Sequence, residues 1–62
     1  MMWCVESSED PIAAENREDA VAHAKAITRR SGGRAVVRRG DGRLVIEFVD
    51  GEMVSYRAGD PV

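Results

Sequence analysis

Two Asp-Gly pairs divide the stretch RAVVRRGDGRLVIEFVDGEMVSYR, residues 34–57, into three segments rich in apolar and β-branched residues. An Asp-Gly pair flanked by alternating apolar residues is the strongest short-range signal for a β-hairpin. We therefore expect two-residue turns at Asp41-Gly42 and Asp50-Gly51. The strands that these turns join are predicted over residues 34–39, 43–50 and 52–57.

The turns also predict the register, and the register sorts the side chains onto two faces. Val37 is expected opposite Ile46, and Phe48 opposite both Ala35 and Met53. One face is then wholly apolar and consists of Ala35, Val37, Leu44, Ile46, Phe48 and Met53. The opposite face mixes charged and apolar residues and consists of Arg34, Val36, Arg38, Val45, Glu47, Val49, Glu52, Val54 and Tyr56.

One helix is predicted over residues 16–31, before the first of these strands. Asn16 is a favourable N-cap, and Asp19 occupies the capping-box position three residues later. Gly32 is expected to end the helix in the left-handed conformation. The apolar stripe of the helix comprises Ala20, Val21, Ala24 and either Ile27 or Thr28. Because these side chains are small, the helix should lie close against the apolar face of the sheet.

These elements predict a single small domain of the α+β class. A strand over residues 1–6 and a loop over residues 7–11 precede the helix, which gives the order β-α-β-β-β with one helix packed on an antiparallel β-meander sheet. Such a short chain of 62 residues buries only about 60% of the surface that its unfolded form exposes. Domains of this size usually gain stability from disulfides, a metal or a partner subunit.

The residue types needed for chemistry are scarce. Cys4 is the only cysteine and His23 the only histidine, which excludes an internal disulfide and leaves no basis for a cysteine- or histidine-rich metal site. No pattern of carboxylates, nucleophiles or glycines matches a catalytic site or a phosphate loop. We therefore predict no catalytic residue, no metal and no cofactor, and that the protein is not an enzyme.

The mixed face of the sheet suggests an interaction surface. Five of its nine residues are apolar, which is a high share for a solvated sheet. Arg38 and Glu47 lie diagonally across neighbouring strands and are expected to pair. The hypothesis is a small self-associating or protein-interaction module, most simply a homodimer, with an interface formed by Val36, Arg38, Val45, Glu47, Val54 and Tyr56. An inhibitor of a host protein that docks through the same valine and tyrosine face is an alternative.

A cluster of arginines supports a second alternative, an accessory nucleic-acid-binding protein. Six arginines fall within fifteen residues and would contact phosphates, namely Arg29, Arg30, Arg34, Arg38, Arg39 and Arg43. The net charge of -2 and the isoelectric point near 5.2 disfavour this alternative. The positions of the side chains discriminate the two hypotheses: convergence on one surface favours phosphate binding, whereas pairing with acids disfavours it.

Several short motifs resemble the small bacterial and phage domain-of-unknown-function family 2188. They are the Trp-x-Val strand Trp3-Cys4-Val5, the helix start Glu18-Asp19-Ala20-Val21, the Gly-x-Ala-Val-Val strand from Gly33 to Val37, the turn Asp41-Gly42-Arg43, and a Tyr…Asp-Pro tail at Tyr56 and Asp60-Pro61. The family has no established activity, so the resemblance implies a fold and no active site. The excess of arginine over lysine, eight residues against one, suggests that the protein is encoded by a phage or an actinobacterium.

The chain carries neither a long apolar run nor the features of a signal peptide. We therefore expect no membrane contact and a cytoplasmic location, which is the host cytoplasm if the protein is phage-encoded.

Overall fold

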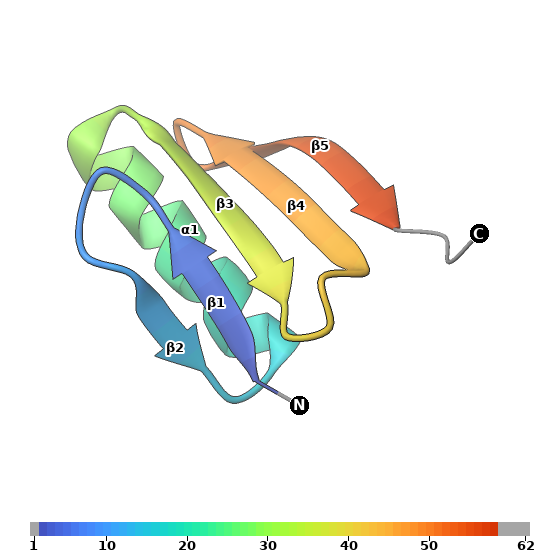
Figure 1. Ribbon diagram of the computed structural model, residues 1–62. Coiled ribbons are helices and arrows are strands. Elements are labelled where there is room, and N and C mark those ends of the chain that lie inside the picture. The colour runs from blue at the N-terminus through green and yellow to red at the C-terminus, as the bar shows by residue number, and fades with distance from the viewer. Residues whose placement is uncertain (1, 59–62) are drawn as a thin grey trace.

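The computed structural model describes residues 2–58 and places one helix against a five-stranded sheet (Figure 1). The sheet is antiparallel throughout, with the order β2-β1-β3-β4-β5. Its elements are β1 (Trp3–Glu6), β2 (Ile12–Ala14), α1 (Arg17–Ser31), β3 (Arg34–Arg39), β4 (Leu44–Val49) and β5 (Glu52–Ala58). The α+β class is confirmed. Met1 of the predicted first strand and the Asp60-Pro61 tail motif lie outside the described residues.

Strand β2 corrects the predicted order, which becomes β-β-α-β-β-β. Its three residues pair with β1, with Ile12 opposite Val5 and Ala14 opposite Trp3. A three-residue segment directly after Pro11 is too short to show the alternation by which strands are recognised in a sequence. Because β1 also pairs with β3, it lies inside the sheet, and Val5 is fully buried.

The predicted register of the meander is confirmed at both hairpins. Val37 lies opposite Ile46, and Phe48 lies opposite both Ala35 and Met53. The second turn has the two-residue form expected, because Asp50 and Gly51 both adopt positive φ, 53° and 82°. Positive φ at both central residues is the requirement of a type I′ turn.

The first turn is longer than predicted, although it keeps the same register. β3 ends at Arg39 and β4 begins only at Leu44, so residues 40–43 form the loop. The Gly42 N–H donates to the Arg39 carbonyl over 2.8 Å, and the Arg43 N–H donates to the Asp41 carboxylate over 2.9 Å. An aspartate that accepts from the backbone two residues later stabilises a turn locally, which explains why the tighter hairpin does not form.

Helix α1 has the ends that the sequence predicts. The Asn16 side chain accepts a hydrogen bond from the Asp19 N–H over 2.8 Å, and Gly32 closes the helix with φ of 69°. Three of the four buried residues of α1 have small side chains, namely Ala20, Ala24 and Thr28, so the helix approaches the sheet closely. The hydrophobic core comprises Val5, Ala14, Ala20, Ala24, Ile27, Ala35, Val37, Leu44, Ile46 and Phe48.

A buried hydroxyl ties α1 to the turn between β4 and β5. Thr28 is fully buried; its Oγ1 donates to the Ala24 carbonyl over 2.9 Å and accepts from the Gly51 N–H over 2.7 Å. The Arg29 side chain lies across Gly51, where a Cβ would come within 2.6 Å of Arg29 Nε. These contacts hold the C-terminal end of the helix to the Asp50-Gly51 turn.

The helix packs over β1, β2, β3 and β4, and β5 lies beyond it (Figure 1). The prediction that Met53 lies under the helix is therefore wrong in one respect. Met53 faces the helix side of the sheet, as its pairing with buried Phe48 requires, but its side chain is 55% exposed.

Candidate interaction surface on strand β5

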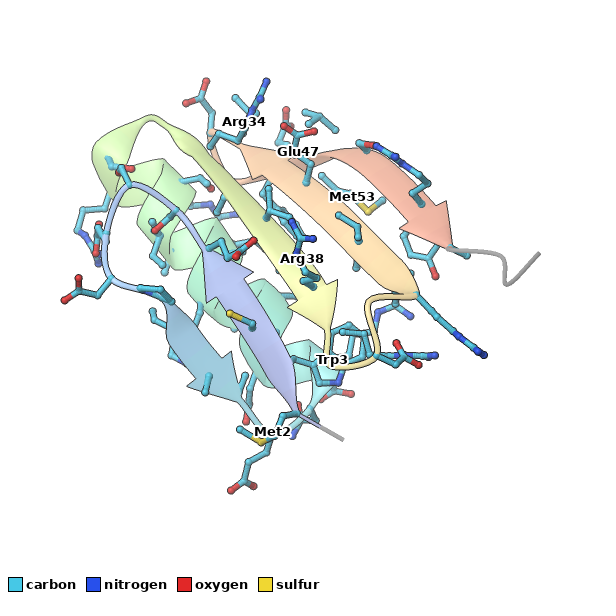
Figure 2. The ribbon with its side chains drawn as sticks, viewed as in Figure 1. Met2, Trp3, Arg34, Arg38, Glu47 and Met53 are labelled. Atoms are coloured by element: carbon cyan, nitrogen blue, oxygen red, sulfur yellow. The ribbon has the colours of Figure 1, made fainter. Side chains whose placement is uncertain are left out.

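The sheet face away from the helix is crossed by ion pairs. Arg38 pairs with Glu6 of β1 over 3.1 Å, and Arg34 pairs with Glu47 of β4. The predicted Arg38–Glu47 pair does not form. Glu47 lies diagonally between Arg34 and Arg38 and pairs with Arg34 (Figure 2). Val36 and Val45 lie on this face and are half-buried between the charged side chains.

A β-bulge separates the six predicted interface residues. Met53 lies opposite Phe48, but the next pair is Ser55 opposite Glu47, so Val54 has no partner in β4. The extra residue reverses the alternation along the rest of β5. Tyr56 therefore lies opposite Ile46, on the helix side of the sheet, and the prediction that it joins Val36 and Val45 is wrong.

The helix side of β5 carries two large, exposed side chains. Met53 is 55% exposed and Tyr56 48% exposed, and Val54 at the bulge is 57% exposed. The Arg17 guanidinium lies 5.4 Å from the centre of the Tyr56 ring, within the range of a cation–π contact. Apolar surface on this strand is thus concentrated where α1 does not cover it.

An open cleft of about 450 Å³ runs between α1 and β5. Its floor is formed by the core residues Ile46 and Phe48, and its outer wall includes Met53. The helix lines it with Arg17, Glu18, Val21 and Lys25. The cleft therefore has an apolar floor of buried core residues and a charged helical rim.

The outer edge of β5 is the longer of the two sheet edges. β5 has seven residues, whereas β2 at the opposite edge has three. Short edge strands are one of the ways in which proteins avoid unwanted pairing, and a long edge strand offers a row of unpaired backbone groups. The charged residues of β5 are confined to Glu52 and Arg57, near its ends.

The six arginines of the proposed phosphate-binding cluster do not converge. Arg30 Nη2 donates to both carboxylate oxygens of Glu9, over 2.8 and 2.9 Å, and Arg39 pairs with Asp41. Arg34 and Arg38 form the ion pairs described above, on the face away from the helix. Arg29 covers Gly51, and Arg43 is exposed in the first hairpin loop. By the criterion set from the sequence, this arrangement disfavours phosphate binding.

The Arg39–Asp41 pair perturbs both of its members. The Arg39 guanidinium donates to the carboxylate of Asp41, and with the Arg43 N–H it lowers the pKa of Asp41 from about 3.8 to about 2. The same hydrogen bond raises the pKa of Arg39. The charged Asp41 carboxylate thus joins Arg39, at the end of β3, to the backbone of Arg43 in the hairpin loop.

The remaining reactive residues lie apart from one another. His23 is exposed on α1, and Cys4 is half-buried on the face of β1 away from the helix, beside Arg38. Within residues 2–58, no three His, Cys, Asp or Glu side chains gather closely enough to hold a metal ion.

Sequence reasoning missed the cleft and the buried contact between Thr28 and Gly51. The cleft depends on how far one helix reaches across the sheet, which no local motif encodes. The Thr28 contact has a weak signal, because a threonine within the apolar stripe of a helix must satisfy its hydroxyl, but the sequence does not say which turn supplies the partner.

No helix among the residues that the structure describes is long and apolar enough to cross a membrane. In comparison with known proteins, no family model matches the chain, and no similar curated protein or solved structure was found.

Proposed function

We propose that this chain is a small, non-enzymatic protein-interaction module that docks an extended polypeptide segment on the outer edge of β5. The observation that carries the proposal is the exposure of Met53 and Tyr56 on the helix side of a seven-residue edge strand. The docking site is this edge together with the cleft between α1 and β5.

Strand addition makes use of both features of the site. In this mode of recognition, the backbone of the partner completes the hydrogen bonding of the edge strand, and alternate side chains enter pockets beside it. Every second residue of an added strand points to the helix side of the sheet, where the exposed side chains of Met53 and Tyr56 lie beside it.

The interface first inferred from the sequence gives less support. Its residues on the face away from the helix are half-buried valines between Arg34–Glu47 and Arg38–Glu6 ion pairs. An inhibitor of a host protein would now be expected to dock through β5, since Tyr56 lies there. The paired arginines leave the nucleic-acid alternative without a supporting observation.

Two measurements on one set of variants test the proposal. Sedimentation of the purified chain up to high micromolar concentration reports self-association, and selection of displayed random peptides on the immobilised chain reports binding of foreign segments. The variant M53S/Y56S removes both exposed side chains from the helix side. The matched control, V36T/V45T, alters the opposite face and keeps its β-branched side chains.

The expected result is association in at least one of the two assays, lost in M53S/Y56S and retained in V36T/V45T. Loss in the control alone would move the interface to the face away from the helix and overturn the proposal. A monomer at every concentration that also selects no peptide would overturn it as well. Thermal unfolding of both variants establishes that each is folded.

A further inference from the structure

The two charged residues of β5 have opposite signs and lie near opposite ends of the strand. Glu52 is its first residue and Arg57 its last but one. The ion pairs among residues 2–58 join other residues and include neither of these two. Both side chains are exposed. An antiparallel copy of the same strand presents the opposite charge at each end.

The bulge places these charges on the same face of the sheet. Glu52 lies opposite Val49 and Arg57 lies opposite Val45, so both point away from the helix. In a regular strand, residues 52 and 57 are separated by an odd number and point to opposite faces. The extra residue at Val54 removes this mismatch, and it likewise brings Met53 and Tyr56 together on the helix side.

We propose that the segment docked on β5 is β5 of a second copy of this chain, paired antiparallel about a two-fold axis; this inference rests on the proposed function. Glu52 then lies opposite Arg57 of the partner subunit, and Met53 lies opposite the partner's Tyr56. The two-fold axis repeats each contact, so the interface contains two ion pairs on one face and two apolar pairs on the other. The result is a continuous ten-stranded sheet, because two five-stranded sheets join at their β5 edges.

Other registers match less of the strand. A dimer centred on Tyr56 pairs only the part of β5 that follows the bulge, and it leaves Glu52 opposite no residue of the strand. A dimer centred on Arg57 sets like charges opposite each other, which is destabilising. A dimer centred on Ser55 sets Met53, on the helix side, against the partner's Arg57, on the other face. The proposed register is the one that matches faces and charges on both sides of the bulge.

Charge reversal tests the register with little effect on the fold, since neither residue belongs to an ion pair within residues 2–58. In the E52R variant the new arginine faces Arg57 of the partner subunit, and in the R57E variant the new glutamate faces the partner's Glu52. Each reversal is expected to raise the dimer dissociation constant on the order of tenfold, since each dimer contains two such exposed pairs. The double variant E52R/R57E restores opposite charges and should return the constant to within about threefold of the starting protein.

The D10R variant serves as the control, because it makes the same acid-to-arginine change in an exposed loop and should leave the dissociation constant unchanged. A dimer dissociation constant that the single reversals leave unchanged, or that the double variant fails to restore, would overturn the proposed register and leave the proposed function standing. A chain that stays monomeric but selects peptides through Met53 and Tyr56 would exclude the second copy as occupant and support only the docking site. Failure of both assays would overturn the proposed function itself.

Discussion

Replacing Thr28 by valine tests how the helix is fastened to the sheet. Valine has nearly the same shape as threonine, so the substitution removes the hydroxyl and leaves the packing around α1 in place. The Gly51 N–H, which donates to Thr28 Oγ1 over 2.7 Å, then has no partner in a buried position. The Ala24 carbonyl loses only a second hydrogen bond, since it also accepts from the backbone one turn later.

The expected loss of unfolding free energy follows from the burial of the Thr28 hydroxyl and the Gly51 N–H. A buried donor left unsatisfied costs about 1 to 3 kcal/mol. A domain of this length has a free energy of unfolding of roughly 3 to 9 kcal/mol, on a scale of about 0.05 to 0.15 kcal/mol per residue. The loss is therefore a large fraction of the total. It corresponds to a decrease in Tm of about 4 to 24 °C, at about 4 to 8 °C per kcal/mol for such small domains.

The assay is urea unfolding followed by circular dichroism, with T28S as the matched variant. Serine keeps the hydroxyl and removes one methyl group, so T28S should lose about 1 kcal/mol and less than T28V. Amide hydrogen exchange at Gly51 should also accelerate more in T28V than in T28S. If T28V unfolds at the same urea concentration as the starting protein, or T28S is the less stable of the two variants, the hydroxyl does not fasten the turn to the helix.

Three further predictions concern the turns and the helix cap. The pKa of Asp41 is lowered to about 2, so the contribution of this carboxylate to stability is complete above about pH 4 and is lost as the pH falls towards 2. The difference in unfolding free energy between the protein and the D41N variant should therefore shrink over that range. An NMR titration that places the pKa of Asp41 near 4 would contradict this prediction. The G51A variant should lose more than about 1 to 2 kcal/mol of unfolding free energy, which is roughly the cost of a left-handed non-glycine residue, because the added Cβ also meets the Arg29 side chain. The loss of unfolding free energy caused by G51A should be smaller in an R29A background, and an equal loss would exclude the clash. N16A should cost about 1 kcal/mol in urea unfolding, with N16D close to the starting protein, and no loss in N16A would show that the cap is dispensable.

Local signals predicted the parts of the fold that depend on neighbours in sequence. The Asp50-Gly51 pair fixes a type I′ turn by its own backbone preferences, and Asn16 and Gly32 set the ends of α1 in the same way. The two Asp-Gly pairs predicted the register of β3, β4 and the start of β5 correctly, although the first turn is longer than expected.

The face of Tyr56 could not be predicted, because it depends on a bulge that no residue type announces. Val54 is an ordinary strand residue, and strict alternation placed Tyr56 beside Val45. A single extra residue reverses every later side chain, so an error at position 54 moves the tyrosine to the other side of the sheet. The pairing of the arginines was likewise hidden, since Arg30 reaches Glu9 across a loop of the fold rather than a neighbouring turn.

Simple dimensions explain why β5 is left open. An α-helix with its side chains is about 10 to 12 Å wide, and strands are spaced about 4.8 Å apart, so five strands extend about 19 Å between their outer axes. One helix is therefore too narrow to cover all five strands, and β5 is the strand that it leaves open. The Thr28–Gly51 hydrogen bond holds the C-terminal end of α1 to the β4–β5 turn, while Arg17, at its N-terminal end, reaches Tyr56 only through its long side chain. The exposed apolar strip on β5, formed by Met53 and Tyr56, is thus a consequence of covering five strands with one helix.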